Sequence, residues 1–530
     1  MDRFVIERLP PSAAWPELLF ELDELRYPAR LNCAVALLDD ALAAGCGDRP
    51  CFIGSARTWT YREVAERVAK IGNVLRRHGA GLGTRVLLRG PNSPMTLACW
   101  LAIVRIGAVA VATMPLLRAR ELATVIEKAA IAFALCDARL ADELATAATS
   151  ARHAPDTLYF APDESGSLDR EMRDVSDACA AADTAQDDVA LIAFTSGTTG
   201  VPKGCVHFHR DVLAAADTFS RHVLKPNADD VFCASPPVAF TFGLGGALIF
   251  PMHARAATVL AEVASPHALH DAIARHAVTV CFSAPTAYRA LSNCEPSGLA
   301  SLRRCVSAGE ALSAETRRAF ESATGLSLID GIGSTEMMHI FISAADDDIR
   351  PGATGKPVPG FRAAVFDDAG RELPRGSTGQ LGVKGPTGCR YLDDARQAEY
   401  VRNGWNITGD TYFLDHDGYY WFKGRSDDMI VSAGYNISGL EVEAVLSDYP
   451  DIVECAVVGA PNAERGHIVK AFVVLKTGVE GDDALVRRLQ AFVKANIAPY
   501  KYPRAVAFVK SLPRTETGKL QRYRLRVDHF

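Results

Sequence analysis

The chain has 530 residues, of which 48% are hydrophobic, so it can bury several cores and we expect two or more domains. Its formal net charge of −6 favours neither nucleic acid nor an anionic membrane surface as a partner. The 13 cysteines contain no C-x-x-C pair and no zinc-like spacing, which is typical of reduced thiols in the cytoplasm. We therefore expect a cytoplasmic protein, and we leave monomer and homodimer open.

The N-terminus shows no apolar signal segment. The longest apolar run, 97–117, is interrupted by Arg105, Gly107 and Pro115. These breaks indicate a helix as far as Ile106, followed by a strand over 108–112, rather than a membrane span.

Strand-like apolar runs alternate with helical patterns through most of the chain. The runs cover 85–89, 108–112, 131–136, 189–194, 256–260, 278–282 and 302–307, and helical stretches include 61–78 and 118–129. Continuous apolar strands separated by helices indicate an α/β fold, with parallel sheets covered on both faces. Residues 145–185 are rich in Ala, Asp and Ser with little periodicity and predict a surface insertion.

The pattern changes after the strand-like run 419–422. The segment 423–428 is short and charged, and beyond it we expect helices at 438–447 and 483–495 and strands at 455–458 and 470–475. We therefore predict a large domain over 1–425 and a small α+β domain over 426–530. The polar connection indicates either a hinge or a rigid loop, and the sequence does not separate the two.

A hydroxyl- and glycine-rich loop follows the apolar run 189–194. It comprises Thr195, Ser196, Gly197, Thr198, Thr199, Gly200, Val201, Pro202, Lys203 and Gly204. Glycines let backbone N–H groups turn toward an anion, hydroxyls add donors and Lys203 adds a positive charge. The spacing is not that of a Walker loop, because no Ser or Thr follows the lysine. We interpret the loop as a polyphosphate site rather than an ordinary Gly/Ser/Thr turn.

Three further stretches carry polar residues in turn-like settings. In 330–336, Thr335 can donate to a phosphoryl oxygen and Glu336 is a hard ligand for Mg²⁺. Asp410 can accept from both ribose hydroxyls with Arg425 beside it, and Lys519 ends a loop over 512–519. Taken singly, these stretches also fit a chance turn, a surface salt bridge and a solvated lysine.

In this order, the four stretches resemble the adenylate-forming superfamily of acyl- and aryl-CoA synthetases, adenylation domains and luciferases. The resemblance covers essentially the whole chain, and the 195–204 and 513–519 loops are its most specific motifs. It implies a large domain of parallel and mixed sheets with a β-barrel-like subdomain, and a small mobile domain that carries the catalytic lysine. It also implies ATP, Mg²⁺ and coenzyme A as cofactor and co-substrates.

The resemblance further implies a role for each matching position. The 195–203 loop would hold the β- and γ-phosphates, Thr335 the α-phosphate, Glu336 the Mg²⁺, and Asp410 with Arg425 the ribose. The adenine slot would be lined by Ser307, Ala308, Gly309, Glu310, Asp330, Gly331 and Ile332, although many members carry an aromatic residue where Ile332 stands. Lys519 would bridge the carboxylate and the α-phosphate during adenylation. Asp427 would be the hinge of the small domain, and the coenzyme A tunnel would be formed by Ala433, Gly434 and Tyr435.

The acid pocket in this superfamily is built from the segment 237–245 and from residues after the Thr-Glu pair. Here it would include Phe240, Thr241, Phe242, Gly243, Ser307, Ile332, Gly333 and His339, which suit an aryl ring. One of the two phenylalanines, and His339, also fit as plain core residues. The stretch 331–341 is similar to the benzoate-CoA ligase branch, and stretches such as 114–122 and 432–437 to 2-aminobenzoate-CoA (anthranilate-CoA) ligases.

We therefore expect an aryl-CoA ligase for a 2-aminobenzoate-type acid, with benzoate or a hydroxybenzoate as the alternative substrate. The acid would become an acyl-AMP with loss of pyrophosphate, and a thiol would then attack this mixed anhydride. Three rival interpretations stay open: an adenylation enzyme that loads a carrier protein, a luciferase-like oxygenase, and a non-catalytic nucleotide-binding module.

Overall fold

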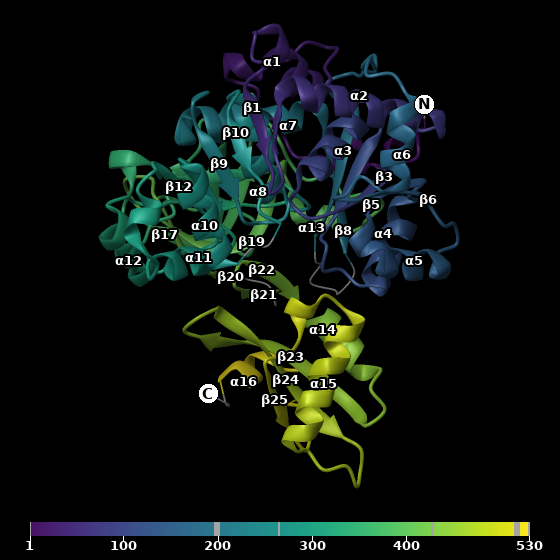
Figure 1. Ribbon diagram of the computed structural model, residues 1–530. Coiled ribbons are helices and arrows are strands. Elements are labelled where there is room, and N and C mark those ends of the chain that lie inside the picture. Colours follow the sequence, from purple (N-terminus) through teal and green to yellow (C-terminus); the bar gives the residue numbers. More distant parts are fainter. Residues whose placement is uncertain (1, 196–201, 263–264, 426–428, 514–519, 528–530) are drawn as a thin grey trace.

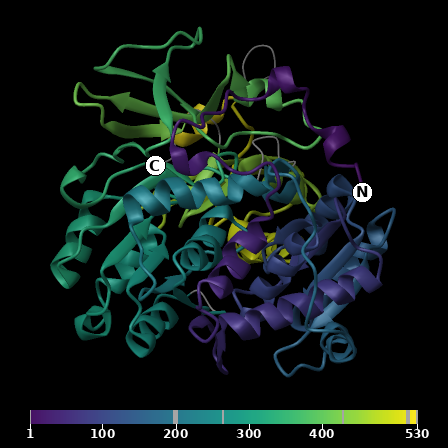
Figure 2. The same cartoon turned by 90° about the horizontal axis from the view of Figure 1, so that it is seen from above.

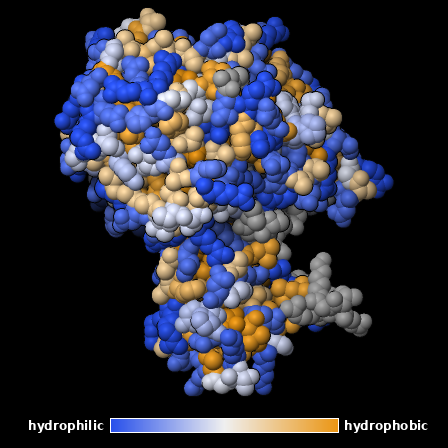
Figure 3. Space-filling view, turned by 90° about the vertical axis from the view of Figure 1, so that its right-hand side faces the viewer, coloured by the Kyte–Doolittle hydropathy of each residue, from blue (hydrophilic) through white to orange (hydrophobic). Residues whose placement is uncertain are grey.

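The computed structural model describes residues 2–195, 202–262, 265–425, 429–513 and 520–527. A large lobe extends to Arg425, and a smaller lobe that begins at Met429 projects from it (Figures 1 and 3). The predicted boundary at Ser426 and the predicted hinge at Asp427 lie outside the described residues.

Two sheets of mainly parallel strands form the body of the large lobe (Figure 1). One sheet has the order β6 (Asp156–Phe160), β5 (Phe133–Asp137), β3 (Arg85–Arg89), β4 (Val109–Thr113), β7 (Val189–Thr195) and β8 (Lys203–Phe208). The other has the order β15 (Lys356–Pro357), β14 (Ile340–Ser343), β13 (Ile329–Gly333), β12 (Arg304–Ser307), β11 (Val280–Ser283), β9 (Val231–Ala234), β10 (Ala257–Val259), β1 (Pro50–Ile53) and β2 (Thr58–Thr60). Antiparallel pairs occur only toward the sheet ends, as in β7–β8 and β13–β14.

Helices cover both faces of the first sheet, as the continuous apolar strands predict. The helices α2 (Tyr61–Arg77) and α3 (Pro94–Arg105) pack on one face, and α4 (Ala119–Ala129) and α5 (Ala141–Ser150) pack on the other. Helix α2 begins at a capping box in which Thr60 accepts from the backbone of Glu63, whose carboxylate accepts from Thr60. The apolar run 97–117 is divided into α3 and β4 as expected, with Gly107 in a left-handed turn between them.

The second sheet is covered in the same manner. The helices α10 (Pro266–His276), α11 (Pro285–Leu291) and α12 (Ala314–Thr324) pack on its outer face. Its inner face shares the main core with α2, α3 and with α7 (His209–Ala215), α8 (Thr241–Leu244) and α9 (Phe250–His253). The two sheets therefore enclose one continuous core, which fixes the relative positions of their strand ends.

A five-stranded antiparallel sheet completes the large lobe. It contains β16 (Arg362–Phe366), β17 (Ser377–Lys384), β19 (Trp405–Leu414), β18 (Val401–Arg402) and β20 (Tyr420–Arg425). The N-terminal segment lies along this sheet, where Leu18 bridges Gly385 (Figure 2). The short helix α13 (Gln397–Tyr400) precedes β18.

The smaller lobe has its own sheet and cores. Its strands are β22 (Tyr435–Ser438), β21 (Met429–Ser432), β24 (Gly466–Leu475), β23 (Ile452–Asn462) and β25 (Ala505–Phe508). The helices α14 (Gly439–Ser447) and α15 (Asp483–Asn496) pack on one face, and α16 (Arg522–Val527) contributes Leu525 to a cluster on the other. The mixed α/β class with a large and a small unit is confirmed.

One sequence expectation was wrong. Residues 145–185 are not a surface insertion throughout, because β6 forms the end of the first sheet and Leu158, Phe160 and Leu168 are buried. The short helix α6 (Ser167–Glu171) packs against β6 in the same region. All 13 cysteines lie in the described part of the chain as free thiols. None of the described helices has the length and apolar character needed to cross a membrane.

Candidate active site

A cavity of about 590 Å³ lies between the lobes, at the carboxyl ends of strands from both parallel sheets. Strand ends that line it are Thr113, Thr195, Ser235, Ser283, Ala308 and Gly333. Parallel strands present their carboxyl ends to the same edge, which is where open α/β sheets bind ligands. The small lobe closes the cavity with residues that include Ala433, Gly434, Tyr435 and Lys501.

The predicted polyphosphate loop connects two paired strands, β7 and β8. Thr195 and Lys203 are partners in the β7–β8 ladder, so they stand opposite each other at the base of the loop. Thr195 and Pro202 line the cavity, whereas Ser196, Gly197, Thr198, Thr199 and Gly200 lie outside the described residues. The carbonyl of Pro202 accepts a hydrogen bond from Lys128 Nζ at 3.0 Å, and the same ammonium pairs with Asp394 at 2.7 Å.

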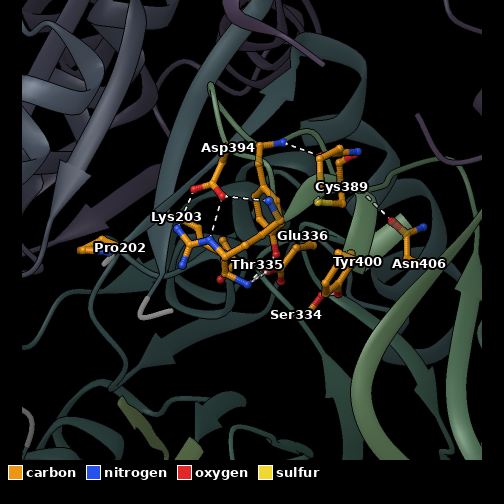
Figure 4. Close-up of polar contacts among 12 residues, drawn as sticks. Pro202, Lys203, Ser334, Thr335, Glu336, Cys389, Asp394, Tyr400 and Asn406 are labelled. Atoms are coloured by element: carbon orange, nitrogen blue, oxygen red, sulfur yellow. Dashed lines mark hydrogen bonds and ion pairs between the residues drawn. The ribbon is translucent and has the colours of Figure 1, made fainter. Parts of the chain in front are cut away.

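Lys203 and Glu336 meet at a tyrosine hydroxyl. Lys203 Nζ donates to Tyr391 Oη at 2.7 Å, and Tyr391 donates to Glu336 Oε1 at 2.5 Å. The ammonium and the carboxylate are 3.5 Å apart (the region is shown in Figure 4). Burial alone would raise the pKa of the Glu336 carboxyl, but Lys203 and Tyr391 lower it below its ordinary value. Glu336 is therefore an anion although only 6% of it is exposed.

The loop that carries Thr335 is anchored by a buried histidine. His207 Nε2 donates to the backbone carbonyl of Thr335 at 2.7 Å, and its other nitrogen lies 3.6 Å from Asp211. Asp211 also accepts from Arg390 Nη1 at 2.8 Å, and both side chains are fully buried. Burial disfavours the imidazolium, but Asp211 and Cys205 together outweigh it and the pKa of His207 rises to about 9.

Aromatic rings enclose one end of the cavity. Phe240, Thr241, Phe242, Gly333 and His339 line it, whereas Gly243, Ser307 and Ile332 do not belong to the lining. Gly243 is instead held against the carbonyls of Pro236 and Pro237, where a Cβ would come within 2.5 Å of each. Ile332 packs against the main core.

His339 is the polar group of this aromatic end. Its ring lies 4.5 Å from that of Phe250 and 5.6 Å from that of Phe242, between ring centroids. Both ring nitrogens are buried and have no hydrogen-bond partner among the described residues. Burial lowers the pKa of His339 to about 3, so the imidazole is neutral and presents one donor and one acceptor.

The residues predicted to hold the nucleoside are divided between the cavity wall and its surroundings. Ala308 and Gly309 line the cavity. Asp330 and Gly331 lie in β13 behind it, and the Asp330 carbonyl accepts from Ser343 Oγ at 2.6 Å. Asp410 and Arg425 are ladder partners in β19 and β20, and their side chains form an ion pair at 3.1 Å.

The β21–β22 turn of the small lobe reaches the cavity wall. Glu310 Oε2 accepts from the backbone N–H of Gly434 at 3.0 Å, and Glu310 Oε1 accepts from Thr286 N at the same distance. Ala433 and Gly434 adopt left-handed backbone conformations with φ of 49° and 81°, which turn the hairpin toward Gly309. Glu310 thus contacts the docked lobe and is not part of the cavity lining.

A buried cluster of charges also joins the lobes. Lys501 Nζ donates to Glu121 at 2.5 Å and to Glu441 at 2.6 Å, and Glu121 Oε2 accepts from the backbone of Ala498 at 2.8 Å. The three charged side chains are between 4% and 11% exposed. Glu121 belongs to the large lobe and the other residues to the small one, so this cluster is assembled only when the lobes are docked.

The predicted catalytic lysine, Lys519, lies outside the described residues. Leu512 and Leu520, on either side of its segment, pack with Phe472 on the sheet face opposite α14 and α15. Neither leucine lines the cavity. In this arrangement of the lobes, the β21–β22 hairpin faces the cavity.

Sequence reasoning did not identify Tyr391, His207, Glu121 or Lys501. Tyr391 reaches Lys203 because its backbone bridges Cys205 of β8, a pairing between segments far apart in the chain. Glu121 and Lys501 are separated by 380 residues and would read singly as exposed charges. The alternation of Lys203, Cys205 and His207 along one strand was the one local signal for His207.

Known proteins match this chain over nearly its whole length. The family model described as "AMP-binding enzyme" matches residues 39–390, and that of its C-terminal domain matches 441–519. A benzoate–CoA ligase from Thauera aromatica is 35% identical over 513 residues, covering 95% of this chain and 97% of the relative.

Two solved structures are similar over the same extent. The anthranilate CoA ligase AuaEII in complex with anthranoyl-AMP has a TM-score of 0.74 at 33% identity, covering 95% and 98% of the two chains. The amide bond synthetase McbA from Marinactinospora thermotolerans has a TM-score of 0.85 at 28% identity, covering 94% and 100%.

Proposed function

Because the chain belongs to the family of AMP-binding enzymes, we propose that it is an ATP-dependent aryl-CoA ligase for a 2-aminobenzoate-type acid. It is an AMP-forming acid–thiol ligase that uses ATP, Mg²⁺ and coenzyme A. The acid carboxylate attacks the α-phosphate and releases pyrophosphate, and the thiol of coenzyme A then displaces AMP from the acyl-AMP. The first step is needed because a carboxylate is itself a poor electrophile.

Groups for the first step lie partly within the described residues and partly outside them. The Thr195–Lys203 loop would hold the β- and γ-phosphates, and Thr335 the α-phosphate, at the same edge of the sheets. Glu336 fits Mg²⁺, because it is an anionic oxygen ligand whose Oε2 makes no hydrogen bond to another described residue. Mg²⁺ would offset the repulsion between two approaching anions, as would Lys519.

The nucleoside would lie along the remaining wall. Ala308 and Gly309 leave room for a planar base, with Glu310, Asp330, Gly331 and Ile332 around them, and Asp410 with Arg425 would hold the ribose.

The aromatic end of the cavity is the observation that carries the choice of acid. Phe240 and Phe242 provide faces and edges for an aryl ring, and the neutral His339 provides one acceptor among them. An ortho-amino group would satisfy that acceptor, whereas benzoate would leave it unpaired at a cost of about 1–3 kcal/mol. A 2-aminobenzoate is therefore preferred, with benzoate or a hydroxybenzoate as the second candidate.

The second step would use the arrangement of the lobes seen here. At the cavity wall Ala433 has a small side chain and Gly434 has none, and Tyr435 stacks on Tyr500 at 4.3 Å between ring centroids. This hairpin would shape the entry for a thin pantetheine chain. For the first step the small lobe would turn about Asp427 and bring Lys519 to the acid. The free thiols are consistent with a cytoplasmic location.

The test is pyrophosphate release from ATP and Mg²⁺ against 2-aminobenzoate, benzoate, hydroxybenzoates and a medium-chain fatty acid. Coenzyme A, a phosphopantetheinylated carrier protein and a simple amine are compared as acyl acceptors. We expect small aryl acids to support turnover, 2-aminobenzoate to give the highest kcat/KM, and coenzyme A to be the acceptor. Turnover with chain acids alone would refute the acid assignment, and acyl transfer only to the carrier or the amine would refute the ligase assignment.

A further inference from the structure

Tyr391 occupies the space between the two charged groups that face the polyphosphate site. It is 1% exposed, and its ring meets that of Tyr400 edge to face at 5.8 Å between centroids. Its hydroxyl contacts Lys203 and Glu336 at the 2.7 and 2.5 Å given above. Nothing in the proposed reaction yet accounts for this side chain.

The hydrogen bonds at this hydroxyl can run in only one direction. An ammonium has donors and no acceptor, and an ionised carboxylate has acceptors and no donor. The phenol hydroxyl has one hydrogen, so Tyr391 accepts from Lys203 and donates to Glu336. The two charges are thereby joined through a neutral group that keeps them 3.5 Å apart.

Hydrogen bonds of Gln397 hold the backbone of Tyr391 in place. Gln397 Oε1 accepts from the backbone N–H of Tyr391 at 2.9 Å, and Gln397 Nε2 donates to the carbonyls of Cys389 and Ala14. Cys389 N in turn donates to Asn406 Oδ1 at 2.9 Å (Figure 4). The hydroxyl is therefore held by the fold and not by the charges that it joins.

We propose that Tyr391 is a positioning residue that spaces Lys203 and Glu336 so that both stay available to Mg²⁺ and ATP. By binding Oε1, the phenol leaves Oε2 of Glu336 for a cation, and by accepting from Lys203 it keeps that ammonium from closing directly on the carboxylate. Without the hydroxyl, the two charges would form a direct ion pair, which the incoming nucleotide would have to break. This inference rests on the proposed function of the site.

The test compares Tyr391→Phe with Tyr400→Phe. Each substitution removes one hydroxyl from neighbouring rings, but among the described residues the hydroxyl of Tyr400 contacts Ser334 Oγ alone, at 3.4 Å. Calorimetric binding of ATP with Mg²⁺ is measured without any acid, so that no turnover is required. The KM for ATP, the Mg²⁺ dependence of pyrophosphate release, and thioester formation from supplied acyl-AMP and coenzyme A are measured separately.

We expect Tyr391→Phe to weaken MgATP binding by about 10- to 100-fold, because MgATP would have to break the direct ion pair that Lys203 and Glu336 form once the hydroxyl is gone. The Mg²⁺ concentration that gives half-maximal pyrophosphate release should rise as well. The rate of thioester formation from acyl-AMP should stay within about twofold of wild type. Tyr400→Phe should stay within about twofold in all measurements. In an unliganded crystal structure of Tyr391→Phe, Lys203 Nζ should approach Glu336 to about 2.8 Å.

Unchanged MgATP binding in Tyr391→Phe would overturn the inference, as would a Lys203–Glu336 separation that stays as it is here. Equal losses in both half-reactions would also overturn it, because they would indicate a merely structural role. A different result would refute the proposed function: wild-type protein that binds MgATP but releases no pyrophosphate with any acid. In that case the binding and crystallographic measurements still decide the role of Tyr391.

Discussion

Replacing Lys501 by methionine should separate the two half-reactions. Lys501 is the only cation in the hydrogen-bonded cluster with Glu121 and Glu441 described above, and methionine keeps much of its length without the charge. The docked state would then hold two carboxylates, 6% and 11% exposed, that face each other without a counterion. When the lobes are undocked, the Glu121 carboxylate would be hydrated. The substitution therefore raises the free energy of the docked state and not that of the undocked state.

The size of the penalty follows from this burial. Removing one partner of a buried ion pair costs about 3–5 kcal/mol, which corresponds to about 150- to 5,000-fold in the docking equilibrium. Burial already raises the pKa of Glu441 above its ordinary value, so this carboxylate can take up a proton and relieve part of the repulsion. We therefore expect the equilibrium constant for docking of the small lobe to fall by about 100-fold.

The assay measures each half-reaction alone. Pyrophosphate release reports the first step, and thioester formation from supplied acyl-AMP with coenzyme A reports the second. In Lys501→Met the second step should slow at least about tenfold, whereas the first should stay within about threefold, because it would use another orientation of the small lobe.

The matched control is Arg120→Gln, which removes a second ion pair across the same interface. Arg120 and Asp448 pair at 2.9 Å, but their side chains are 52% and 59% exposed, so we expect less than about 1 kcal/mol and little kinetic change. Equal slowing of both steps in Lys501→Met would refute the reasoning. A second step that is as fast as in wild type would refute it too.

Three further predictions concern single side chains. Lys519→Ala should abolish pyrophosphate release yet retain thioester formation from acyl-AMP, and normal pyrophosphate release would refute its role. His339→Ala should reduce the preference for 2-aminobenzoate over benzoate by about tenfold and leave the KM for ATP unchanged; equal loss of both would contradict the pocket assignment. His207→Gln should remove a pH dependence of stability. Since Asp211 and Cys205 together outweigh burial and raise the pKa of His207 from 6.5 to about 9, the wild-type advantage in unfolding free energy should be full below pH 6.5 and be lost as pH rises through 9. Chemical denaturation across this range measures it, and a constant difference between wild type and His207→Gln would refute the assignment.

The sequence predicts those features of the structure that depend on residues close together in the chain. The parallel strands and their covering helices were predicted because apolar runs and their breaks are local, as in the division of 97–117 into α3 and β4. The segment 145–185 was misread because β6 is short and buries only Leu158 and Phe160, which are too few residues to show a periodic pattern.

The family resemblance of the ordered motifs predicted that Thr195, Lys203, Thr335 and Glu336 share one site. In the structure Thr195 and Thr335 line the cavity, and Lys203 lies 3.5 Å from Glu336. The environment of these residues was decided by tertiary structure. The direction of the bonds at Tyr391, the charge of His207 and the neutrality of His339 depend on partners and burial supplied by distant segments. Likewise, Glu121 and Lys501 form one cluster only because the lobes dock, since desolvation and pairing are properties of neighbours in space and not of neighbours in the chain.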